Sequence, residues 1–145
     1  MNRRFLAVLV VAAGIGLAGC SAPAGLKALD REATAEDKLP ESMSLTGVDL
    51  NVDAGTVRLL ATDDGVRYFA ARGSTAGTVC LIVAPEAVPE RWRAACGGAA
   101  TDEEILALTG VDGSTTKFIR DGVDASQPKY EGWKQIHENV LIVAR

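Results

Sequence analysis

The sequence TVRLLATDDGVRYFAARGSTAGTVCLIV, residues 56–83, decides the fold. It contains three apolar, β-rich runs, at 56–61, 66–71 and 78–83. Asp63-Asp64-Gly65 separates the first two runs, and a loop with glycine at both ends, residues 73–77, separates the second from the third. Asp-Gly between such runs is a strong hairpin signal, and a longer glycine-containing loop is the next commonest connection. The stretch therefore predicts an antiparallel meander of three strands.

Further strand-like segments follow the meander. Pro85 and Pro89 indicate a wider loop, after which come short β-rich runs at 92–96, 105–108, 115–120 and 139–143. Turn-forming sequences separate the later runs, and residues 128–132 read as loop. We therefore expect residues 45–145 to form a small, mainly β, antiparallel domain of the meander or sandwich type.

The segment before this domain has a different pattern. Leu26, Leu29 and Ala33 recur at helical spacing with charged residues between them, and Pro40 ends the pattern. We therefore expect one N-terminal helix, within a segment that spans residues 20–44.

The first nineteen residues have the three zones of a secretory signal peptide. Met1–Arg4 is short and basic, residues 5–18 are uncharged and mostly apolar, and small residues lead up to Cys20. The apolar run is shorter than the roughly 20 residues that span a bilayer. Residues 1–19 are therefore predicted to direct export and then to be removed.

Cys20 gives this leader a more specific meaning. Leu17-Ala18-Gly19-Cys20 closely resembles the bacterial lipobox. The resemblance implies that a diacylglyceryl group is attached to the Cys20 sulfur and that the chain is cut before it. Two acyl chains hold a protein stably on a membrane, whereas one holds it only marginally. The expected location is the extracytoplasmic face of the cell membrane, and the alternative is an ordinary signal peptide that ends near a cysteine.

Cys80 and Cys96 are the remaining cysteines. Disulfides form and persist outside the cytoplasm, and both residues lie within strand-like runs. We therefore predict a disulfide between them. The alternatives are two free buried thiols or a redox pair, although the spacing is not the C-x-x-C of redox motifs.

The charge balance restricts the partners. The leader holds two of the fifteen Lys and Arg residues and none of the nineteen acidic residues, so the rest of the chain has a net charge of −6. A nucleic-acid interface needs a basic patch, and adhesion to anionic lipids needs basic clusters. We expect no nucleic-acid partner, and membrane contact through the lipid on Cys20 alone.

Catalytic and metal-binding patterns are weak. His137 is the single histidine, so the sequence offers no histidine pair for a metal site or a proton relay. Residues 49–55 resemble the start of a calcium loop, but Ala54 and Leu60 stand where that loop needs Gly and Glu. The chain has no Gly-x-Ser-x-Gly motif and no phosphate-binding P-loop. We expect no cofactor, no metal and no enzymatic activity.

Tyr130 and Trp133 are the aromatic residues that we consider as a candidate contact patch. Aromatic side chains are enriched at binding hot spots, so an exposed pair would form a candidate contact patch. The alternative is that these side chains fill the core or pack at its edge, in a chain in which aromatic residues are scarce.

The part of the chain that follows the leader contains a series of short sequence features in a recognisable order. They lie at 29–32, 65–72, 95–97, 118–122 and 139–143. This order resembles a group of small exported or membrane proteins of actinobacteria whose activity is uncharacterised. The resemblance supplies no activity. The lipobox-like sequence, the cysteine pair and the lack of catalytic motifs lead us to expect a lipid-anchored, non-enzymatic binding module for a protein or a cell-envelope component. The alternatives are an accessory subunit of a membrane complex and an enzyme with an unfamiliar site, which a deep cleft with convergent polar groups would favour.

Overall fold

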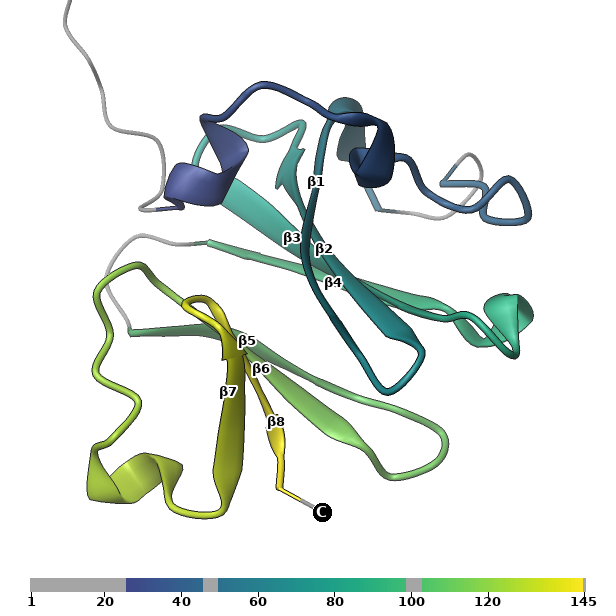
Figure 1. The fold of residues 1–145 in the computed structure, drawn as a ribbon. Helices are drawn as coiled ribbons and strands as arrows, with labels where there is room; N and C mark the ends of the chain where they lie inside the picture. Colours follow the sequence, from purple (N-terminus) through teal and green to yellow (C-terminus); the bar gives the residue numbers. More distant parts are fainter. Residues whose placement is uncertain (1–25, 46–49, 99–102, 145) are drawn as a thin grey trace, which may run out of the picture.

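The computed structural model describes residues 26–45, 50–98 and 103–144, which form two antiparallel four-stranded sheets (Figure 1). The first sheet has the order β1-β2-β3-β4 and is built from β1 (Val52–Asp63), β2 (Val66–Gly73), β3 (Thr78–Pro85) and β4 (Arg93–Gly98). The second has the order β5-β6-β8-β7 and is built from β5 (Glu104–Thr109), β6 (Thr115–Ile119), β7 (Trp133–His137) and β8 (Val140–Val143). The predicted antiparallel β fold and its meander are confirmed.

The main core lies between the two sheets. Side chains alternate between the faces of a strand, and one face of β2 and β3 packs against one face of β6 and β8. The buried residues of this cluster are Tyr68, Ala70, Val79, Leu81 and Val83 from the first sheet and Phe118 and Val140 from the second, together with Leu26 and Leu29. The arrangement is therefore a sandwich.

The outer faces of both sheets are also covered. Phe69 and Ile82, on the outer face of the first sheet, pack with Met43 from the N-terminal segment. Ile119 and Leu141, on the outer face of the second sheet, pack with Tyr130 from the 120–132 loop. Both sheets thus bury apolar residues on two faces, which explains the unbroken apolar runs in β3 and β8.

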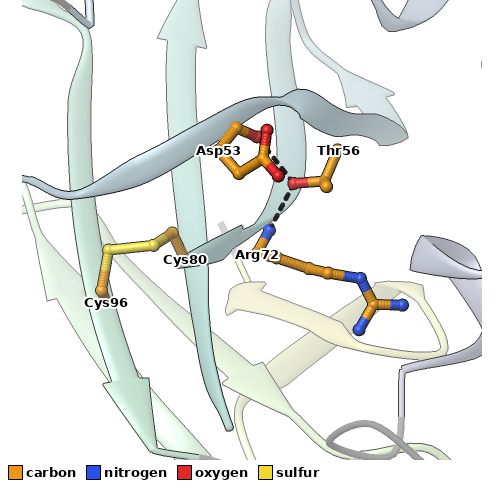
Figure 2. Close-up of a disulfide and its surroundings, with 5 residues drawn as sticks. All are labelled: Asp53, Thr56, Arg72, Cys80 and Cys96. Carbon is orange, nitrogen blue, oxygen red and sulfur yellow. Dashed lines mark hydrogen bonds between the residues drawn. A yellow bond between two sulfur atoms is a disulfide. The ribbon is translucent and has the colours of Figure 1, made fainter. Parts of the chain in front are cut away.

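Cys80 and Cys96 form the predicted disulfide (Figure 2). They are directly opposite each other in the β3–β4 ladder, with their Cα atoms 4.0 Å apart. In the neighbouring β1–β2 pair, the Thr56 hydroxyl donates to the backbone oxygen of Asp53 and accepts from the backbone N–H of Arg72. These bonds hold a bulge in β1, where the register shifts between Asp53 and Arg58.

The predicted N-terminal helix is wrong. Residues 26–38 instead form two single 3-10 turns, η1 (Lys27–Leu29) and η2 (Ala35–Asp37), and two similar turns, η3 (Pro89–Arg91) and η4 (Pro128–Tyr130), occur later in the chain. Leu26 and Leu29 are buried in the core between the sheets. Their spacing, which also suits one helical turn, serves to fill that core, and tertiary packing overrides the local pattern.

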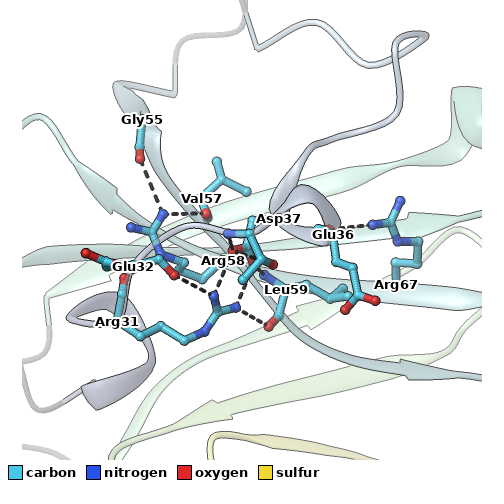
Figure 3. Close-up of polar contacts among 10 residues, drawn as sticks. Arg31, Glu32, Glu36, Asp37, Gly55, Val57, Arg58, Leu59 and Arg67 are labelled. Carbon is cyan, nitrogen blue, oxygen red and sulfur yellow. Dashed lines mark hydrogen bonds and ion pairs between the residues drawn. The ribbon is translucent and has the colours of Figure 1, made fainter.

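The extended link between η1 and η2 is fixed by an ion pair (Figure 3). Both Asp37 carboxylate oxygens accept hydrogen bonds from the Arg31 guanidinium, at 2.6 and 2.7 Å. The same carboxylate accepts from the backbone N–H groups of Thr34 and Leu59. It therefore ties the N-terminal segment to β1.

Among the described residues, no helix has the length and apolar character needed to cross a membrane.

Candidate functional site

A cleft of about 760 Å³ opens at one end of the sandwich. It lies where the β1–β2 hairpin, the β3–β4 loop, the β5–β6 hairpin and the end of β8 approach one another. Its charged lining residues are Asp63, Asp64, Arg91, Arg93, Asp112 and Lys134, and its apolar ones include Val66, Val83, Val88, Val111, Ile142 and Val143. Ligand pockets usually measure about 300–1,000 Å³ and combine apolar walls with a few polar groups.

Two tight hairpins shape the mouth of the cleft. Asp64 and Gly65 have φ values of 49° and 70°, the left-handed conformation that the central residues of a type I′ turn adopt. In the β5–β6 hairpin the Asp112 carboxylate accepts hydrogen bonds from the backbone N–H and the hydroxyl of Ser114, at 3.0 and 2.6 Å. These bonds hold the pKa of Asp112 below its usual range, so this carboxylate stays ionised at neutral pH.

Arg93, at the start of β4, places a cation in the cleft. Its side chain is only 19% exposed. Its Nη1 lies 3.7 Å from the Asp112 carboxylate, and its Nη2 lies 3.4 Å from the Ser114 hydroxyl. Its Nε is buried without a hydrogen-bond partner among the described residues. These contacts are longer than the 2.7–2.9 Å typical of charge-assisted bonds, so the guanidinium is incompletely satisfied.

Gly110 makes room for this guanidinium. A Cβ atom on Gly110 would lie 1.6 Å from Nη1 of Arg93. The two positions are linked sterically, since any side chain at 110 would displace the Arg93 guanidinium from its place in the cleft.

A second ion pair joins the two sheets at the cleft. Lys134 of β7 donates to the Asp63 carboxylate at the end of β1, at 2.6 Å. Lys134 is exposed and Asp63 is half-buried, so the pair contributes at most about 1 kcal/mol to stability. Its position matters more, because it fixes one ammonium and one carboxylate on the same wall.

The rim of the cleft is apolar and exposed. Val111, at the tip of the β5–β6 hairpin, is 85% exposed, and Val143, at the end of β8, is 45% exposed. They are the two large hydrophobic residues classed as exposed in the part of the chain that the structure describes. Single exposed valines are ordinary, but here both line one cleft.

Two charged groups of the cleft are engaged by neighbouring side chains. Asp112 is held ionised by Ser114, and the Lys134 ammonium is held by Asp63. The Asp112 carboxylate is therefore not tuned toward neutral pH as a general base would be. His137 does not line the cleft. It is half-buried, its Nδ1 accepts from the backbone N–H of Asn139, and burial lowers its pKa.

No protein-family model, curated protein or solved structure matches this chain.

The aromatic residues of the candidate contact patch are packed side chains. Tyr130 is 4% exposed and belongs to the cluster on the outer face of the second sheet, and the half-buried Trp133 packs against that cluster. The Lys117 ammonium lies 4.7 Å from the Trp133 ring centroid and 5.7 Å from that of Tyr130, within the range of cation–π contacts. The geometry agrees with the packing alternative.

The remaining predicted positions are less informative. Cys20 lies outside the described residues, as does Asp49 of the calcium-loop comparison. The Asp53 carboxylate accepts from the backbone N–H of Gly55 and so stabilises the bulge in β1. Within the described ranges, no three histidine, cysteine or acidic side chains converge as metal ligands would.

Proposed function

We propose that this protein is a lipid-anchored, extracytoplasmic binding module that uses the cleft between its two sheets. The single observation that carries the proposal is the convergence, in one cleft, of an incompletely paired arginine and an exposed apolar rim. The lipobox-like sequence at 17–20 supports the location.

The position of η1, at the start of the described chain, supports an outward-facing cleft (Figure 1). The backbone N–H of Lys27 donates to Asp121, just after β6, and Arg72 at the end of β2 bonds to Asp30. The cleft is lined instead by the opposite ends of β2 and β6, at Val66 and Thr115. A strand of seven residues is about 20 Å long, so entry and cleft lie at different ends of the sandwich.

The short tether strengthens this orientation. Cys20 is six residues before Leu26, and an extended chain spans at most about 3.6 Å per residue. A lipid on Cys20 would therefore hold the entry end of the domain within about 22 Å of the membrane. The cleft would face away from it, toward the envelope or the medium.

A site-specific crosslinker tests the role of the cleft. A photoreactive residue is placed at Val111, on the rim, and in a control variant at Ala76, an exposed residue in the β2–β3 loop at the other end. We expect the full chain, expressed in its bacterial membrane, to capture an envelope component from position 111 and not from position 76. Capture from 76 alone would contradict the proposal. Turnover of a substrate that is lost on one polar substitution in the cleft would favour an enzyme instead.

Cys20→Ala tests the anchor. The variant should lose acyl labelling and leave the membrane fraction, while Cys80→Ala keeps the label. Unchanged membrane retention with intact acyl labelling of the Cys20→Ala variant would refute the lipid attachment.

A further inference from the structure

We infer that the cleft binds a peptide carboxylate: Arg93 holds the carboxylate, and the valine rim holds the adjacent apolar side chains. The inference rests on the proposed binding function and adds the chemical class of the ligand.

The arginines of this chain differ in how completely they are paired. Arg31 makes two bonds of 2.6 and 2.7 Å to Asp37, and Arg72 makes one of 2.6 Å to Asp30. These are the distances of strong charge-assisted bonds. Arg93 has only the 3.7 and 3.4 Å contacts to Asp112 and Ser114, although it is the more deeply buried member of its pair. An incompletely paired cation in a sheltered place attracts an anion.

The local carboxylate does not fill this need. Asp112 is engaged by Ser114 through two bonds of 3.0 and 2.6 Å, which fix it within its own turn. Arg91, which also lines the cleft, forms no ion pair among the described residues. Arg93, with one long ion pair, and Arg91, with none, therefore present two guanidinium groups on this side of the cleft. Guanidinium and carboxylate match geometrically and bind through paired hydrogen bonds.

The rim specifies what accompanies the carboxylate. Val111 and Val143 expose apolar surface at the mouth, and Val88 and Ile142 continue it inward. An inorganic anion would leave that apolar surface exposed to water. A ligand with an apolar group next to its carboxylate would cover it, at a gain of about 25 cal/mol for each Å² removed from water.

The polar groups of the cleft favour a peptide over a fatty acid. The Lys134–Asp63 pair and the Ser114 hydroxyl line the same space. A hydrocarbon chain laid over them would remove their water and supply no hydrogen bond, which is costly. A peptide backbone carries one donor and one acceptor per residue and can satisfy them. Capture of a terminal carboxylate is also an established mode of peptide recognition.

The test uses the full chain in nanodiscs of zwitterionic lipid, with empty nanodiscs subtracted. The probes are N-acetylated tetrapeptides of Ala, Val, Leu and Gly with a free C-terminal carboxylate, the same peptides as C-terminal amides, and decanoate. We expect the carboxylate peptides to bind at least about tenfold more tightly than the amides, since a hydrogen bond to a charged group is worth about 1.5–3 kcal/mol and 1.4 kcal/mol is tenfold.

Two variants assign the effect to Arg93. Arg93→Gln removes the charge, and Gly110→Ala keeps it but pushes the guanidinium aside, because the added Cβ meets the end of a flexible side chain and not backbone. Both should lose the preference for carboxylate over amide. Arg120→Gln, at the far end of β6, should keep it. Thermal unfolding of each variant shows whether it is folded. If Arg93→Gln does not fold, the binding preference of Gly110→Ala decides the role of Arg93.

Three outcomes would overturn the inference: equal affinity for carboxylates and amides, no binding by any peptide, or tighter Arg93-dependent binding of decanoate than of the peptides. Crosslinking from Val111 to an envelope component together with any of these would leave the binding function in place and remove only the ligand class. Arg93-dependent binding of carboxylate peptides without capture from Val111 would support the ligand class and contradict an envelope component as the partner.

Discussion

Gly97 in β4 lies directly against the backbone carbonyl of Ile105 in β5: a Cβ atom on Gly97 would be 2.9 Å from that oxygen. The two strands are consecutive in the chain and belong to different sheets. This contact is therefore where one side of the sandwich closes, and it requires a residue without a side chain.

Gly97→Ala should destabilise the domain. The obstacle is a backbone atom, which cannot rotate away, so the two strands must separate by some tenths of an ångström. Overpacking of this kind costs about 1–3 kcal/mol. Urea unfolding followed by tryptophan fluorescence measures the shift in midpoint. Gly98→Ala is the matched control, because nothing lies within 4 Å of a Cβ at that position. Equal midpoints for the two variants would show that β4 and β5 are not in close contact.

Asp37→Ala should cost about 3 kcal/mol of unfolding free energy, because it removes a charged acceptor of several hydrogen bonds, each worth about 1.5–3 kcal/mol. The Asp37 side chain is 4% exposed, and its loss leaves the backbone N–H groups of Thr34 and Leu59 without their acceptor. Arg31→Ala and the double variant complete a double-mutant cycle, in which we expect the two effects to be clearly non-additive. Additive effects would mean that the pair is not formed in solution.

The Asp37 carboxylate should make the stability of the domain depend on pH in the acidic range. The hydrogen bonds from Arg31 and from the backbone hold the pKa of Asp37 far below its usual range. Its contribution is complete above the unfolded-state pKa of about 3.9 and is lost as pH falls further, because the unfolded chain then binds a proton that the native state does not. The stability difference between the wild type and Asp37→Asn should therefore shrink between about pH 5 and pH 2. A constant difference over that range would contradict the low pKa.

Local sequence signals predicted part of this architecture. Asp64-Gly65 identified the first hairpin because its turn type depends on two adjacent residues, and the strand-like runs around Cys80 and Cys96 identified the disulfide. β7 was missed, since its sequence, Trp133 to His137, is mostly polar and forms the edge of its sheet. The N-terminal turns were mistaken for a helix because Leu26 and Leu29 have a spacing that both structures share.

The cleft could not be predicted in the same way. Asp63, Arg93, Asp112 and Lys134 come from four separate segments, and each is ordinary in its local sequence. Their meeting depends on how the two sheets pack, which no local pattern encodes. The incomplete pairing of Arg93 is visible only from distances. Gly110 leaves the space that the Arg93 guanidinium occupies. In the sequence, however, a glycine in a hairpin is explained by the turn alone.

The disulfide should stabilise the domain by about 3 kcal/mol, the value expected in the chain-entropy model for a closed loop of about 16 residues. It clips β4, the edge strand that carries Arg93, onto β3. The double variant Cys80→Ala and Cys96→Ala should therefore unfold at lower urea concentration and show a weaker preference for carboxylate peptides. Dithiothreitol should bring the wild type to a similar midpoint and leave the double variant unchanged. Two thiols that react with maleimide in the denatured, unreduced protein would show that the bond is absent.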